Sequence, residues 1–93
     1  MRASGKRVTV VGRVVRVRSR FDGGWRVRLA DTGGALGAAE IRPSNLLPPP
    51  RRGTRILVRG HICYDPTHGW YAIDPVDAWF DAGAHSDSED SRD

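Results

Sequence analysis

Polar and apolar residues alternate along most of this chain with a period of two, which is the spacing of an extended strand. The clearest case is residues 54–64, where Ile56, Val58 and Ile62 fall on one side. No segment has the pattern of a full helix, and Pro48-Pro49-Pro50 excludes one of normal length between residues 43 and 53. The sequence therefore predicts an all-β domain with at most one helical turn.

Five strands are expected, over residues 8–20, 25–30, 35–42, 54–64 and 70–80. The first changes its inward parity, so we expect a bulge between Gly12 and Val15. Gly, Asp and Pro favour turns, and they cluster at residues 21–24, 31–34 and 65–69. Asp74-Pro75 should disrupt regular pairing within the last strand. A long first strand that changes face fits a closed barrel, because it can belong to both halves of the sheet.

Charge is unevenly distributed along the chain. Residues 1–60 have 14 Lys and Arg against 3 Asp and Glu, a net +11, whereas residues 61–93 have 1 against 8, a net −7. All the basic residues except Lys6 are arginine, which suits bidentate phosphate contacts and stacking on bases. A GC-rich genome would also favour arginine over lysine, but it does not explain the segregation of charge.

Composition divides the chain into a flexible N-terminus (1–6), one barrel domain (7–81) and a disordered acidic tail (82–93). The tail is expected to compete weakly with an acidic ligand for the basic barrel. The single Cys63 excludes an internal disulfide framework. No stretch approaches the ~20 apolar residues of a membrane span, and no apolar signal region is seen, so a cytoplasmic location is expected.

Three stretches, in this order, resemble oligonucleotide-binding (OB) domains. They are a Val- and Gly-rich first strand at residues 8–14, a second strand that ends in Leu29-Ala30-Asp31-Thr32-Gly33-Gly34, and a fourth strand between Gly53 and Gly60. The resemblance covers residues 7–81. It implies a five-stranded antiparallel barrel that binds on the face of strands two and three, flanked by the 1–2 and 4–5 loops. Many OB domains have a helix between strands three and four, but here residues 43–52 are proline-rich. Either Leu46 and Leu47 plug the barrel, or this end is less well closed.

The first two strands carry alternating arginines that a hairpin would place on one outer surface, with no carboxylate expected on that face. Such like charges repel each other, and an anionic ligand would relieve the cost. The alternative interpretation is a solvated outer face. The candidate nucleic-acid-binding residues, with the aromatics and the histidine near the loops, are Arg16, Arg18, Arg20, Arg26, Arg28, Arg42, Tyr64, His68, Trp70 and Tyr71.

Exposed aromatic rings beside positive charge suit single strands, because bases stack on them. One of Trp70 and Tyr71 must point outward, and the sequence leaves open which. Trp25 shares parity with Val27 and Leu29 and is expected in the core. The sequence thus predicts a binding module for single-stranded DNA or RNA, without cofactor, metal or catalytic site. The alternative is an OB-fold subunit that binds an acidic protein.

Two further patterns bear on catalysis and on metal binding. Asp31-Thr32-Gly33 is the signature of aspartic proteases, in which two such aspartates share a proton across a dimer. However, Gly34 replaces the usual alanine and no glycine-rich flap follows, so a turn is the preferred interpretation. The histidines and the cysteine have no metal-ligand spacing; they are His61, Cys63, His68 and His85.

Overall fold

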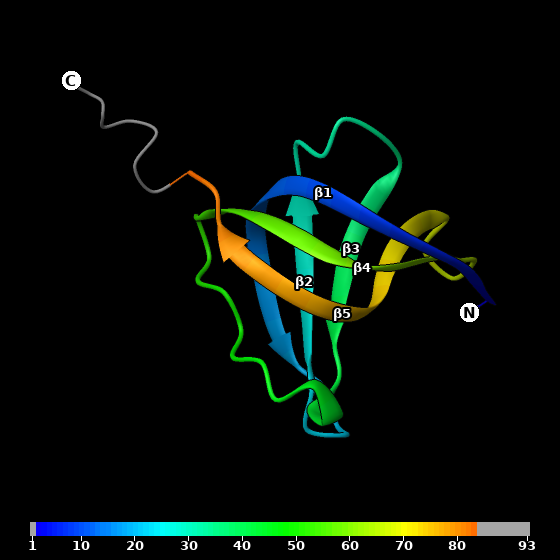
Figure 1. Ribbon diagram of the computed structural model, residues 1–93, viewed down its shortest axis with the longest axis horizontal. Helices are drawn as coiled ribbons and strands as arrows, with labels where there is room; N and C mark the ends of the chain where they lie inside the picture. Colours follow the sequence, from blue (N-terminus) through cyan, green and yellow to red (C-terminus); the bar gives the residue numbers. More distant parts are fainter. Residues whose placement is uncertain (1, 84–93) are drawn as a thin grey trace.

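The computed structural model describes residues 2–83, with side chains described from Lys6 onward. The acidic tail predicted from residue 82 therefore lies, from residue 84, outside the described residues. Five strands and one short 3-10 turn follow one another along the chain (Figure 1). They are β1 (Arg2–Ser19), β2 (Trp25–Ala30), β3 (Leu36–Ile41), the 3-10 turn (Pro43–Asn45), β4 (Arg55–Asp65) and β5 (Trp70–Asp81).

The strands close into a barrel in the order β1-β2-β3-β5-β4. The all-β class and the five strands are confirmed, but purely antiparallel pairing is wrong. β3 and β5 run parallel, with Ala38 opposite Ala72 and Ala39 opposite Ile73. The physical reason is one of parity. Strand direction cannot alternate all the way round a closed ring with an odd number of strands, so one neighbouring pair must be parallel.

The predicted bulge in the first strand is confirmed. The pairing of β1 with β2 shifts register between Val14 and Arg16. The first half of β1 pairs with β4 and its second half with β2, and the two ladders overlap at Arg13. Val14 is fully buried on the inner side. Beyond the bulge, Arg16 and Arg18 are exposed.

The core fills the inside of the barrel with aliphatic side chains from every strand. Partly buried side chains, Trp25 among them, pack against it as expected. Apolar burial of this kind is the main favourable term in folding. The buried cluster consists of Val14, Val27, Leu29, Ala39, Ile41, Ile56, Val58, Ile73 and Val76.

The proline-rich connection between β3 and β4 covers one end of the core. Pro50 is buried beside core residues, and the indole Nε1 of Trp79 donates a hydrogen bond to the carbonyl of Pro48 at 2.8 Å. Leu47 packs against the core as predicted. Leu46 does not: it is 89% exposed, because it caps the 3-10 turn in a left-handed conformation with φ 56°.

The last strand continues through its proline. β5 includes Asp74 and Pro75, which are joined by a cis peptide bond. The disruption predicted at Asp74-Pro75 is seen in the pairing of β5 with β4, whose register shifts on either side of Gly60. Among the described residues, no helix is long and apolar enough to cross a membrane.

Candidate nucleic-acid interface

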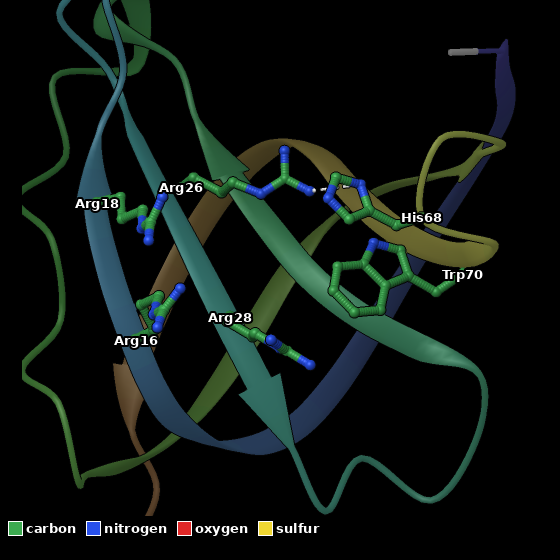
Figure 2. Close-up of a pocket in the computed structure, with 6 residues that line it drawn as sticks. All are labelled: Arg16, Arg18, Arg26, Arg28, His68 and Trp70. Carbon is green, nitrogen blue, oxygen red and sulfur yellow. Dashed lines mark hydrogen bonds between the residues drawn. The ribbon is translucent and has the colours of Figure 1, made fainter.

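Four of the predicted arginines lie together on the outer face of β1 and β2. Arg16 is directly opposite Arg28 in the ladder, and Arg18 is opposite Arg26. They share one hollow with two residues from the β4–β5 loop and the start of β5 (Figure 2). The hollow thus unites six of the ten predicted site residues: Arg16, Arg18, Arg26, Arg28, His68 and Trp70.

Arg20 and Arg42 lie elsewhere and bind carboxylates. Arg20 is 3.1 Å from Asp22 and 3.2 Å from Glu40, and it lines a neighbouring hollow. Arg42 donates to both oxygens of Asp74, at 2.7 Å and 2.9 Å. The bidentate bond raises the pKa of the Arg42 guanidinium. Both guanidiniums are therefore already engaged by carboxylates.

The expectation of an outer face without carboxylates is wrong. Glu40 of β3 is directly opposite Arg26, and its side chain is only 5% exposed. Its two oxygens lie 3.2 Å from Arg20 and 3.1 Å from Arg26. Burial raises the pKa of Glu40, and the two arginines partly offset that rise. Glu40 therefore neutralises part of the predicted positive surface.

A second carboxylate comes from the end of β4. Asp65 is buried, with its Oδ2 2.6 Å from Nδ1 of His68 and 3.4 Å from the Arg26 guanidinium. Burial alone would raise the pKa of Asp65, but hydrogen bonds from His68, the Thr67 amide and Arg26 outweigh it, so the pKa is lowered. Figure 2 shows the Arg26 side chain extending across the hollow to His68. These contacts fix the β4–β5 loop against β2.

Two groups of arginines can therefore be distinguished. The paired arginines are Arg20, Arg26 and Arg42, which bind the buried carboxylates Glu40, Asp65 and Asp74. The unpaired arginines are Arg16, Arg18 and Arg28, which form no ion pair with any residue between 2 and 83 and are exposed.

The aromatic residues divide between two places. Trp70 borders the hollow, and its ring is stacked on that of His68 with 4.8 Å between the ring centroids. The guanidinium carbon of Arg28 lies 5.1 Å from the centroid of the Trp70 ring. Tyr71 points elsewhere. It forms an edge-to-face pair with Tyr64, its cross-strand neighbour, and each is 42% exposed. Tyr71 is thus the more exposed of the two rings, whereas Trp70 is the ring that lies beside the arginines.

Sequence reasoning missed Glu40 and Asp65. Counting along both strands from the predicted turn at residues 31–34 places Ala39 opposite Arg26; the connection in fact includes Ala35, and this shift of one residue brings Glu40 opposite Arg26. Such a count does not find Asp65 either, because it lies at the end of β4, which does not pair with β2, and is 39 residues from Arg26 in the sequence.

The Asp31-Thr32-Gly33 segment is a turn. Asp31 has a left-handed backbone, φ 58°, is exposed and lies 3.1 Å from Arg13. The Thr32 hydroxyl donates to the carbonyl of Leu36 at 2.9 Å, which ties the turn to β3. The segment thus has the hydrogen bonds and backbone angles of a structural turn.

The thiol and imidazole groups within residues 2–83 form no metal-binding cluster. Cys63 is buried, and burial raises the pKa of its thiol. Among residues 2–83, no three His, Cys, Asp or Glu side chains are placed to hold one metal ion. His85 lies outside the described residues.

No protein-family model and no curated protein sequence matches this chain, so the geometry of the site carries the functional inference.

Proposed function

We propose that this chain is an OB-like module that binds single-stranded nucleic acid in the hollow between the unpaired arginines and Trp70. The observation that carries the proposal is the set of three exposed guanidiniums without a carboxylate partner in the described chain, beside a partly exposed indole. Phosphates bind such guanidiniums, and bases stack on such rings.

The arginine ladder itself favours an anionic ligand. Like charges directly opposite each other in an antiparallel pair are destabilising, and Arg16 faces Arg28 in this way. Arg26 offsets its own charge against Glu40, but Arg16 and Arg28 have no such relief among residues 2–83. A phosphate placed between them would bond both guanidiniums and remove the repulsion.

The shape of the fold adds a second line of support. A closed five-stranded barrel with one parallel pair is compatible with an OB-like fold. OB domains bind oligonucleotides on strands two and three and on the 1–2 and 4–5 loops. In this chain the hollow is bordered by β2 and by the β4–β5 loop, with the Trp70 ring lying over β3 (Figure 2).

The test is binding of a fluorescein-labelled oligo-dT of about ten nucleotides, followed by anisotropy over a salt series. Three phosphate contacts predict a slope of log K against log salt of about −2, at ~0.7 per contact. The double variant Arg16→Ala/Arg28→Ala should bind about tenfold more weakly, with a slope reduced by about 1.4.

A matched control removes the same charge elsewhere. Arg52 and Arg59 are exposed, lie outside the hollow and form no ion pair within the described residues. Arg52→Ala/Arg59→Ala should leave the slope within about 0.5 of the parent protein. If both double variants lose the same affinity for oligo-dT, binding depends on the net charge of the protein and not on the hollow. Absence of oligo-dT binding at low salt would overturn the proposal in favour of an acidic protein partner.

A further inference from the structure

The indole of Trp70 occupies space that a side chain at position 37 would need. A Cβ atom added to Gly37 would overlap Cδ2 and Cε3 of the ring and lie 2.9 Å from Cγ. The φ of Gly37 is not positive, so its backbone would accept another residue. The indole, and not the backbone, is therefore what requires a glycine at this position of β3.

The Trp70 ring is held by packing alone. Its Nε1 is buried and has no hydrogen-bond partner in the described chain. Trp79 differs, since its Nε1 donates to the carbonyl of Pro48. Buried tryptophan N–H groups usually find a partner. Without one, the orientation of the Trp70 indole depends on Gly37, the stacked His68 and the Arg28 guanidinium.

Two hollows meet at this ring. One is the arginine-lined hollow, and the other is lined by residues 29–37, which comprise the end of β2, the β2–β3 loop and the start of β3. Arg28 and Trp70 border both hollows. The second hollow is bordered mostly by small residues, and a Cβ at Gly33 or Gly34 would meet nothing within 4 Å. Trp70 therefore separates the arginine-lined hollow from a second, more open hollow, in which Arg28 and Asp31 are the only charged lining residues of the described chain.

We infer that Gly37 is a positioning residue, which sets the Trp70 indole as the stacking partner of a nucleobase that takes the place of the stacked His68, while the unpaired arginines bind the phosphates. The inference rests on the proposed function and deepens it. It makes Gly37 responsible for the preference for a strand that carries bases over a bare sugar–phosphate backbone. The charged contacts, by contrast, should not depend on Gly37.

The experiment compares oligo-dT with an abasic oligonucleotide of the same length, for the parent protein and for Gly37→Ala. The parent should bind oligo-dT about tenfold more tightly than the abasic strand, as expected for one stacked base. In Gly37→Ala the added methyl displaces the indole, so this ratio should fall to about one to three. The salt slope should be unchanged. Quenching of tryptophan fluorescence by oligo-dT should decrease in parallel.

Two further variants separate positioning from simple loss of structure. Gly34→Ala adds the same methyl where nothing lies within 4 Å and φ is not positive, so it should keep the parent ratio. Gly37→Ala/Trp70→Ala removes the clash. It should bind like Trp70→Ala alone, and Gly37→Ala should lower the melting temperature less in the Trp70→Ala background than in the parent.

The outcomes distinguish this inference from the proposed function. If the parent protein prefers oligo-dT and Gly37→Ala keeps the full preference, Gly37 does not position the ring and only this inference fails. If the parent binds both strands equally with a salt-dependent affinity, phosphate binding stands and stacking on Trp70 is refuted. If the parent binds neither strand, both proposals fail together.

Discussion

The paired and the unpaired arginines occupy the same side of the barrel and differ in what surrounds them. Arg26 and Arg28 are two residues apart on β2 and both point outward. Arg26 is opposite Glu40 and also contacts Asp65, whereas Arg28 is opposite the buried Ala38. One residue of β3 thus separates a neutralised guanidinium from one that remains available.

The difference teaches that the number of arginines on a face is a poor guide to its ligand surface. What decides is the pattern of buried carboxylates beneath them. Glu40 and Asp74 are about 5% and 4% exposed and each is held by arginine, so these arginines serve the fold. A buried ion pair contributes little net stability, but removing one partner is costly. Substitutions in the two groups should therefore affect different properties.

The largest effect is expected at the best-formed pair. Arg42→Ala would leave the buried carboxylate of Asp74 without either of its two guanidinium bonds. We expect a loss of about 2 kcal/mol in the free energy of unfolding, moderated because the Arg42 side chain is half-exposed and water can enter. Urea unfolding measures it, with Arg59→Ala as the control expected to change by under about 0.5 kcal/mol. A similar loss of unfolding free energy in Arg59→Ala would show that paired and unpaired arginines do not differ in their contribution to stability.

The next effect depends on pH. The lowered pKa of Asp65 means that its ionised form stabilises the fold at pH values above the pKa of the unfolded chain. That stabilisation disappears as the pH falls through the lower folded-state pKa. Asp65→Asn should cost about 1 kcal/mol at neutral pH, and the difference from the parent should narrow below about pH 4. A difference that stays constant down to about pH 3 would show that the charge of Asp65 is not the stabilising feature.

The smallest effect is expected from a substitution in the unpaired group. Arg16→Glu would place a carboxylate opposite Arg28 in the β1–β2 ladder and convert a repulsive pair into an attractive one. Thermal and urea unfolding should show a gain of about 0.5 kcal/mol. The same change at a paired position, Arg26→Glu, should destabilise the protein, because it adds a carboxylate beside Glu40 and Asp65. Destabilisation by Arg16→Glu would mean that Arg16 already has a favourable partner.

Much of the fold could be predicted from period and turn residues, because both act locally. Alternation located four strands to within one residue, whereas β1 begins at Arg2 and not at the predicted residue 8. The parity change in β1 located the bulge between Val14 and Arg16. The parallel contact of β3 with β5 has no local signal, since it joins strands brought together only by closure. The same limit applies to Asp65, which contacts Arg26 from the end of β4, a strand that does not pair with β2.

The candidate site was predicted in part for the same reason. Residues on adjacent strands of one hairpin, such as Arg16 and Arg28, follow from strand parity and were placed together correctly. The side on which Trp70 lies depends on the neighbouring Gly37 of β3, a strand 33 residues away in the sequence. The prediction that Leu46 plugs the barrel was wrong, because the left-handed cap of the 3-10 turn directs this side chain to solvent.

Closure of the barrel has one more consequence. Each described strand pairs with two others, which leaves no strand at a full edge of the sheet. Only segments such as the first half of β1, which pairs with β4 alone, have one partner. Closure thus limits the addition of a further strand, which is a common way for β-proteins to capture peptides and also to aggregate.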